Sequence, residues 1–184
     1  MAHAPNLIIR DGTPADLEAC ATLDHRLETE WVWQLSLRND AQDWAVTLRQ
    51  ERLPRPIEIA HSITSQQLTH ALRWNQCWLV AELAPEQVII GYLVMIQDPL
   101  HPVGKVRYLC IEPSLRRLGI AVRLLRVSKQ WARNHQLSLL HAEIPLKNVP
   151  ASRLFQKVGF HFCGFNEQNS PESDIVLYYQ NSLV

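Results

Sequence analysis

The amino-acid sequence predicts one α/β domain in which amphipathic helices flank a mixed sheet. The chain has 184 residues, 47% of them hydrophobic, which is enough for one globular domain with a substantial core. Short apolar segments with strand character alternate with segments of helical periodicity. A helical segment separates the apolar strands expected at 106–111 and 139–144, and such a crossover joins parallel strands.

The first elements are a short strand and a helix. Leu7 to Arg10 is an apolar segment typical of a strand. Thr13 then has the properties of a helix N-cap, and Pro14 suits the first helical position. Apolar residues recur at helical spacing after it, so we expect this helix to run to about Glu28.

A tryptophan-rich region at about 31–75 follows, and we interpret it as an insertion into the domain. Apolar residues alternate within 31–37 and again within 44–48, which predicts a β-hairpin. Pro54 and Pro56 are expected to end the second strand, because proline does not fit inside a central strand.

The rest of the chain supplies the other elements of the sheet. We expect a helix from Ser65 to Trp74 capped by Ser65, strands at Cys77–Leu83, Val88–Ile96 and Val106–Ile111, a helix to about Asn134, a strand at Leu139–Ile144, a helix from Asn148 to a left-handed Gly159, and an antiparallel pair at Phe160–Phe165 and Asp174–Tyr179. In the helix that ends near Asn134, the buried stripe is expected to consist of Ile120, Leu124, Val127 and Trp131.

The turn between the strand at 106–111 and the next helix has the sequence Arg116-Arg117-Leu118-Gly119-Ile120-Ala121. A helix N-terminus has free N–H groups and a partial positive charge, which suit a diphosphate. Gly119 lets the backbone approach phosphate oxygens, and Arg116 and Arg117 add cationic donors. The alternative is an ordinary connection with two solvated arginines, and these six residues alone do not decide between the two.

Two segments together are similar to motifs A and B of the GNAT superfamily, the acetyl-CoA-dependent N-acetyltransferases. Arg116 to Ala121 matches the Q/R-x-x-G-x-G/A pyrophosphate loop, and Asn148 to Phe160 resembles N-x-x-A-x-x-L-Y-x-x-x-G-F. The resemblance is carried by Val88 to Phe165. It implies a central mixed, mostly antiparallel sheet flanked by helices, in which the fourth and fifth strands splay apart.

The resemblance implies that acetyl-CoA lies between the splayed strands. The pantetheine arm would pair with the open edge of the fourth strand. The backbone N–H of Ile111 would face the thioester carbonyl and stabilise the oxyanion. Asn148 would hydrogen-bond the pantetheine arm. Without the resemblance, its position indicates only a helix cap. The implied acetyl-CoA-binding residues are Leu109, Cys110, Ile111, Arg116, Arg117, Leu118, Gly119, Ile120, Ala121, Asn148, Ser152 and Phe155.

The resemblance also implies direct acetyl transfer to a primary amine in a ternary complex, with Glu143, Tyr108 and Ile111 as the catalytic candidates. An alkyl amine has a pKa of about 10 and must lose a proton before it attacks. Glu143 resembles the base of relatives that acetylate N-terminal amines, but it could instead pair with a nearby arginine. Tyr108 is the second candidate, unless its ring belongs to the core. No serine or cysteine stands in a recognisable nucleophile motif, which favours direct transfer.

Phe155 departs from the family pattern. It stands where a tyrosine usually protonates the departing CoA thiolate, and phenylalanine has no hydroxyl. Tyr108, Tyr178, Tyr179 or a water molecule would then have to supply this proton. The alternative is a catalytically weak or inactive acyl-CoA-binding sensor or interaction module.

The acceptor site is expected near the tryptophan-rich region. Trp31, Trp33 and Trp44 could be core residues of the hairpin, or they could form an aromatic wall around the acceptor. In the second case Glu28 and Glu30 would attract a protonated amine. Peptide N-termini, lysine side chains, small amines and antibiotics all remain open as acceptors.

Composition makes several other partners poor candidates. The net charge is +0 and the pI is about 7.1, so nothing indicates nucleic acid or an anionic membrane. There is no apolar run typical of a signal peptide or a membrane span. The four cysteines are far apart and the histidines lack ligand spacing, so we expect no metal, reduced thiols and a cytoplasmic location. The oligomeric state is open between a monomer and a homodimer.

Overall fold

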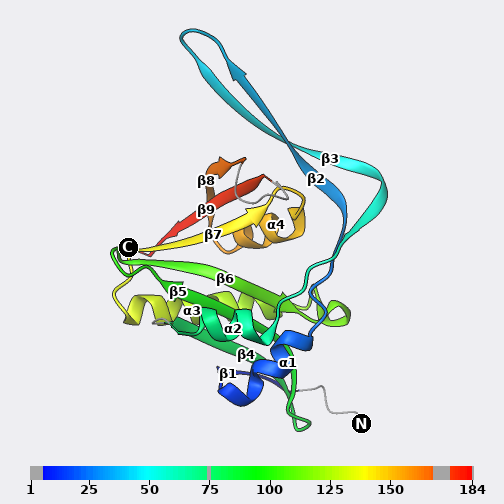
Figure 1. Ribbon diagram of the computed structural model, residues 1–184, viewed down its shortest axis with the longest axis vertical. Helices are drawn as coiled ribbons and strands as arrows, with labels where there is room; N and C mark the ends of the chain where they lie inside the picture. The colour runs from blue at the N-terminus through cyan, green and yellow to red at the C-terminus, as the bar shows by residue number, and fades with distance from the viewer. Residues whose placement is uncertain (1–5, 74–75, 168–174, 184) are drawn as a thin grey trace.

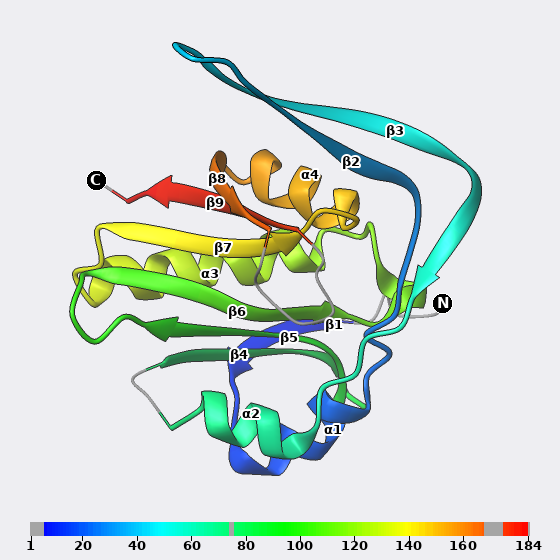
Figure 2. The ribbon, with the colours of Figure 1, turned by 45° about the horizontal axis from the view of Figure 1, so that its top comes forward.

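The computed structural model describes residues 6–73, 76–167 and 175–183. These residues form a seven-stranded sheet and a separate two-stranded hairpin (Figures 1 and 2). The larger sheet has the order β1-β4-β5-β6-β7-β9-β8. Its strands are β1 (Asn6–Asp11), β4 (Gln76–Ala84), β5 (Val88–Gln97), β6 (Val103–Ile111), β7 (Leu139–Pro145), β8 (His161–Asn166) and β9 (Val176–Ser182).

Helices cover both faces of this sheet. They are α1 (Leu17–Thr22), α2 (Ser65–Ala71), α3 (Ile120–Asn134) and α4 (Val149–Lys157), with short 3-10 turns η1 (Pro14–Asp16) and η2 (Pro113–Leu115). The helices α1 and α2 share one core cluster with Val80 and Tyr92 of the sheet. On the other face, α3 and α4 share a second cluster with Leu93 and Leu177. The predicted α/β architecture, with helices on both sides of a mixed sheet, is confirmed.

Adjacent strands of the larger sheet are antiparallel except β6 and β7. These two strands are parallel, as predicted, because α3 carries the chain back across the sheet between them. The last two strands, β8 and β9, form the predicted antiparallel pair. The predicted start of the last strand at Asp174 lies outside the described residues.

The first helix is shorter than predicted. α1 ends at Thr22, and the residues from Leu27 to Glu30 belong to the next strand instead. The Asp24 carboxylate accepts a hydrogen bond from the backbone N–H of Arg26 at 2.9 Å. Such a side-chain-to-backbone turn competes with the helix and redirects the chain.

The buried stripe of α3 is also rotated from the prediction. Ile120 and Leu124 are buried as expected, but Val127 is 41% exposed and Trp131 is only half-buried. The stripe continues through residues displaced by one position, namely Leu125, Ser128 and Ala132. The predicted stripe was placed through the larger apolar side chains. In the structure, the small residues Ser128 and Ala132 face the sheet where the helix lies close to it.

The tryptophan-rich region forms the predicted hairpin, but with longer strands. β2 (Leu27–Asn39) pairs with β3 (Trp44–Ile59). The prediction that Pro54 and Pro56 end the second strand is wrong. The register shifts between Thr29 and Trp31, so the stretch 53–56 has no directly opposite residue in β2. Proline is tolerated there because the strand needs no ladder donor at that point.

The helix α2 is capped by Thr64, not by Ser65. The Thr64 hydroxyl accepts the N–H of Gln67 at 3.1 Å, and the Gln67 side chain accepts the N–H of Thr64 at 2.9 Å. The helix ends at Ala71, and the predicted end at Trp74 lies outside the described residues. Among the helices that the structure describes, none is long and apolar enough to cross a membrane.

Candidate active site

The parallel strands β6 and β7 separate partway along their length. They pair from Val103 with Leu139 to Val106 with Ala142, and then the pairing stops. Both strands continue, β6 to Ile111 and β7 beyond Ala142 to Pro145. The expected splay between these strands is therefore present in the structure.

The free edge of β6 faces this gap with backbone polar groups. The N–H of Glu112 donates to the carbonyl of Ile90 on β5 at 2.9 Å. Because successive residues of a strand direct their N–H and C=O groups to opposite sides, those of Leu109 and Ile111 point away from β5. An extended ligand in the gap can therefore pair with the backbone groups of Leu109 and with the N–H of Ile111, whose carbonyl accepts a hydrogen bond from Arg116.

The N-terminus of α3 lies next to the end of β6. Gly119 is its N-cap, with φ 83°, and a Cβ built there would meet nothing within 4 Å. The N–H groups of Ile120, Ala121 and Val122 have no acceptor among the described residues. This helix has 15 residues and no acidic side chain in its first turn. The arrangement suits an anion such as a diphosphate.

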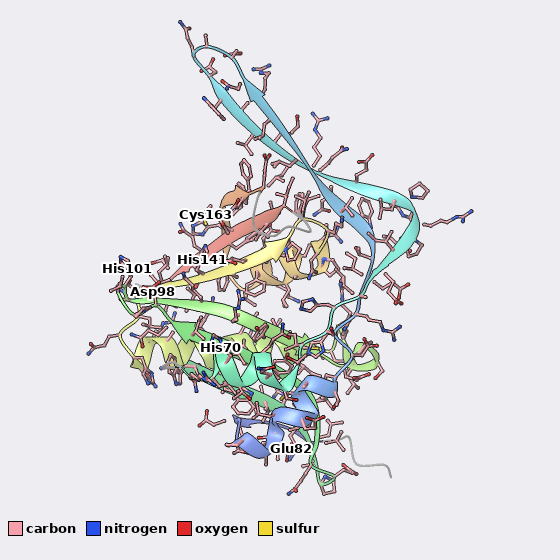
Figure 3. All side chains as sticks on the ribbon, in the orientation of Figure 1. His70, Glu82, Asp98, His101, His141 and Cys163 are labelled. Carbon is pink, nitrogen blue, oxygen red and sulfur yellow. The ribbon has the colours of Figure 1, made fainter. Side chains whose placement is uncertain are left out.

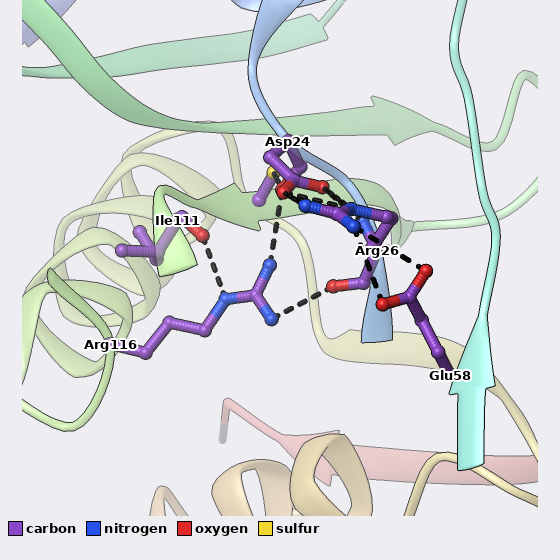
Figure 4. A network of polar contacts seen from close by, with 6 residues as sticks. Asp24, Arg26, Glu58, Ile111 and Arg116 are labelled. Carbon is purple, nitrogen blue, oxygen red and sulfur yellow. Dashed lines mark hydrogen bonds and ion pairs between the residues drawn. The ribbon is translucent and has the colours of Figure 1, made fainter. Parts of the chain in front are cut away.

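The two arginines of this turn have different surroundings. The Arg116 guanidinium donates to three carbonyl oxygens: that of Ile111 at 2.9 Å, that of Arg26 at 2.8 Å and that of Asp24 at 3.1 Å (Figure 4). Arg116 thus fastens the end of β6 to the segment before β2. Arg117 is exposed, with φ 68°. Sequence reasoning treated the two as equivalent phosphate donors, and their surroundings distinguish them.

A small ion-pair network extends from this clamp into the hairpin. Arg26 contacts the carboxylate of Asp24 at 2.6 Å and that of Glu58 on β3 at 3.3 Å (Figure 4). The Arg26 side chain lowers the pKa of Asp24 to about 2. The Cys110 thiol donates to the carbonyl of Asp24 at 3.7 Å, and burial raises its pKa to about 12. Cys110 is therefore a poor nucleophile, since the thiolate is the reactive form.

Glu143 and Tyr108 lie on the same face of the sheet, on opposite sides of the gap. Tyr108 packs against the cluster under α1 and α2, whereas Ala142 and Ile144 belong to the opposite cluster. Since side chains alternate along a strand, Glu143 points to the same face as Tyr108. Tyr178 lies directly opposite Glu143 in β9 and shares this face. The face therefore presents an exposed carboxylate and two half-buried phenols.

Two histidines that sequence reasoning did not single out lie on this face. His141 on β7 (Figure 3) has its ring 5.4 Å from that of Tyr178, and burial lowers its pKa. The His25 ring nitrogen Nε2 is 2.9 Å from the buried hydroxyl of Tyr92. His25 and Tyr92 are 67 residues apart in the chain, so no local spacing could indicate this pair.

The residues of α4 expected to contact acetyl-CoA lie together at its start and on its inner side. The Asn148 side chain accepts the N–H of Ala151 at 3.0 Å and caps the helix. Ser152 is fully buried, and its hydroxyl donates to the carbonyl of Asn148 at 3.3 Å. Phe155 is 5% exposed and packs edge-on against Phe160. Because Tyr179 is only 1% exposed, it is a poor candidate for protonating the thiolate.

The tryptophans of the hairpin have three different environments. Trp33 packs against the main core. Trp31 is half-buried, with the Arg153 guanidinium 5.6 Å from its ring centre. Trp44 is 74% exposed, far along the hairpin. Glu30 pairs with Arg52 at 2.9 Å. No cluster of metal-ligating side chains occurs in the part of the chain that the structure describes.

Comparison with known proteins supports the resemblance read from the motifs. A family model described as the Acetyltransferase (GNAT) family matches residues 35–160. Two sequence relatives are a streptothricin acetyltransferase of Escherichia coli, 26% identical over 81 residues, and GCN5-related N-acetyltransferase 6, chloroplastic, of Arabidopsis thaliana, 29% identical over 86 residues. These matches cover 44% and 47% of this chain, but only 46% and 30% of the relatives.

Solved structures share the fold over nearly the whole chain. A nourseothricin acetyltransferase has a TM-score of 0.82 at 20% identity, with 97% of this chain and 99% of that chain covered. A putative streptothricin acetyltransferase from Bacillus anthracis, in complex with acetyl coenzyme A, has a TM-score of 0.77 at 23% identity, with 96% and 98% covered. With a family model that spans residues 35–160, the chain belongs to the GNAT family of acetyltransferases.

Proposed function

We propose that this protein transfers an acetyl group from acetyl-CoA to a primary amine by direct attack in a ternary complex. The observation that carries the proposal is the gap between β6 and β7, next to the open N-terminus of α3. The gap offers backbone groups for an extended arm, and the helix offers free N–H groups for a diphosphate. Both features lie toward the carboxyl ends of β6 and β7.

The residues present fit acetyl-CoA. The turn from Arg116 to Ala121 would hold the diphosphate through backbone N–H groups, with Arg117 as the exposed cation. Leu109 and Ile111 would pair with the pantetheine arm along the free edge of β6. Arg116 would act indirectly, because three main-chain carbonyls already occupy its guanidinium.

Three groups of this chain would carry the chemistry. Glu143 would accept the proton of the amine, directly or through water, from an exposed position beside the gap. The N–H of Ile111 would stabilise the developing oxyanion. Tyr178 would return a proton to the CoA thiolate in place of the absent hydroxyl at Phe155, since it lies opposite Glu143 on the same face. Tyr108 would line the other side of the gap.

For the acceptor we propose an amine of a streptothricin-type antibiotic. One sequence relative and two structural neighbours carry streptothricin or nourseothricin in their names. A protonated acceptor amine would be attracted to Glu143. A peptide N-terminus is the competing acceptor, because fold neighbours include a ribosomal-protein-S18-alanine N-acetyltransferase from Escherichia coli, at 9% identity and a TM-score of 0.69.

The test is CoA thiol release from acetyl-CoA, measured with streptothricin, with peptides that offer a free N-terminus and with no acceptor. We expect release that depends on streptothricin and a product heavier by one acetyl group. Thiol release only with peptides would contradict the proposed acceptor but would still support acetyl transfer to an amine. Tight acetyl-CoA binding without release by any acceptor would favour the non-catalytic sensor, for which Phe155 is the supporting feature.

The four cysteines support a proposal for the cellular compartment. Cys20, Cys77, Cys110 and Cys163 are all free thiols in the structure. Free thiols of this kind suit a reducing environment, so we propose the cytoplasm as the site of action.

A further inference from the structure

The outer part of the β2–β3 hairpin, residues 34–49, forms an arm that leaves the body of the molecule. Figures 1 and 2 show it crossing above the side that carries α4 and β8 and ending in a free tip. The hairpin is anchored at its base, where the N–H of Trp33 donates to the carbonyl of Leu146 at 3.3 Å. Trp33 and Leu48 also pack against the main core.

The arm has one apolar face and one polar face. Residues directly opposite each other in an antiparallel pair share a face. One face carries the pairs Leu35–Leu48, Leu37–Val46 and Asn39–Trp44, and the other carries Gln34–Arg49, Ser36–Thr47 and Arg38–Ala45. Because the apolar face is the one that packs on the body at Leu48, its outer half projects beyond the part that is covered.

The outer half of the apolar face is exposed. Trp44 is 74% exposed, Val46 45% and Leu37 41%. A two-stranded ribbon is marginally stable in water on its own. A contiguous group of large apolar side chains on a surface marks an interaction site. The arm therefore lacks the layer that would cover this face.

We propose that a second copy of this chain covers the apolar face, in a two-fold dimer in which each arm lies on the corner formed by α4 and β8 of the other copy. The base of the same face already packs on the core shared with α4, so the partner's arm would extend an existing contact. In an isologous arrangement the two corners cover the exposed residues of both arms at once. This inference does not rest on acetyl transfer.

The arm tip and the proposed corner are complementary in polarity. The corner presents Phe162 of β8, which is 36% exposed beside Tyr179, and the exposed Lys157 of α4. The tip turn carries exposed carboxylates at Asp40 and Asp43. Apolar residues would thus meet Phe162, and acidic residues would meet a basic helix end.

Sedimentation velocity tests the dimer. We expect the full chain to sediment as a dimer at about 10 μM, where a micromolar interface is largely formed. Val46→Asp should raise the dissociation constant at least about tenfold, because a carboxylate would be buried in the apolar face. Thr47→Asp is the matched control: it adds the same charge to the neighbouring residue on the polar face and should leave the dimer unchanged.

Sedimentation as a monomer at about 100 μM would overturn the proposal, because an interface with a micromolar dissociation constant would be almost fully formed at that concentration. An equal effect of Val46→Asp and Thr47→Asp would overturn it as well. Far-UV circular dichroism checks that both variants keep their fold, which is expected because both side chains are exposed.

Disulfide trapping tests where the arm docks. Cys163 is an exposed thiol on β8, next to Phe162 (Figure 3). Asp43→Cys should give a covalent dimer under mild copper-catalysed oxidation, as two thiols lose two protons and two electrons to the oxidant. The double variant Asp43→Cys with Cys163→Ser should not. A covalent dimer that still forms without Cys163 would mean that the two arm tips contact each other, which contradicts docking of the arm on α4 and β8.

Discussion

Gly119 has a backbone conformation and an open surrounding that a single substitution can test. Gly119→Glu would place a carboxylate at the start of α3, where the proposed diphosphate lies, so acetyl-CoA affinity should fall about 100-fold or more. Gly119→Ala is the matched control, because it shares the strain of the left-handed φ but adds no charge and meets no atom within 4 Å. Calorimetry on both folded variants checks this, and equal affinities would contradict the anion site.

Glu143 tests the proposed proton acceptor. Glu143→Gln should lower turnover by about 10²-fold with acetyl-CoA binding intact, which is a typical effect of losing a general base. Activity should partly return at high pH, because the acceptor amine is then already neutral. Rates from pH 6 to about 10 provide the measurement. A loss of the same size at every pH would assign Glu143 a structural role.

Tyr178 and Phe155 are two positions from which a tyrosine hydroxyl could protonate the thiolate. Tyr178→Phe should lower turnover about tenfold or more, because it removes the proposed proton donor for the thiolate. Phe155→Tyr alone should change turnover little, but it should restore activity in the Tyr178→Phe background. The measurement is the steady-state rate of the two single variants and of the double variant. A Tyr178→Phe enzyme with full activity would assign the proton to Tyr108 or to water.

Arg116 acts at the scale of elements, because it joins the end of β6 to the segment that leads into β2. Arg116→Gln should lower the free energy of unfolding by about 2 kcal/mol, since charge-assisted bonds to main-chain carbonyls are lost. For a chain of this size the melting temperature should fall by roughly 4–8 °C. Arg117→Gln is the control, and its exposed side chain should leave the melting temperature within about 1 °C. Equal melting of the two variants would contradict the clamp.

Several elements were predictable because their signals are local. Asn148, Pro150 and the left-handed Gly159 delimit α4 as the sequence indicates, and the crossover through α3 makes β6 and β7 parallel. The errors arose where a longer-range contact overrides a local preference. The prolines of β3 fit because the register of the hairpin shifts opposite them, and that shift leaves no local pattern in the sequence.

The candidate site was only partly predictable for the same reason. The glycine turn is visible in six adjacent residues, and the splay of the two strands was implied by the family resemblance. Two of the three carbonyls bound by Arg116, those of Asp24 and Arg26, belong to one segment that is 90 to 92 residues away in the chain, so the sequence could not distinguish Arg116 from Arg117. The face that joins His141, Glu143 and Tyr178 depends on the pairing of β7 with β9, which spacing along the chain does not reveal.

At the scale of the whole molecule, the short pairing of β6 with β7 divides the larger sheet into two leaves. One leaf is β1-β4-β5-β6, the other is β7-β9-β8, and four residue pairs join them along the sheet. A ligand that bonds to both edges of the gap would make parting the leaves more costly. Saturating acetyl-CoA should therefore slow hydrogen exchange in β7 and β9 more than in β4 and β5, as mass spectrometry of the amides can measure. Uniform slowing across the sheet would contradict a hinge at the gap. Bound acetyl-CoA would then hold the two leaves together in addition to its role in the proposed reaction. Resistance of the second leaf to proteolysis should therefore increase with the concentration of acetyl-CoA.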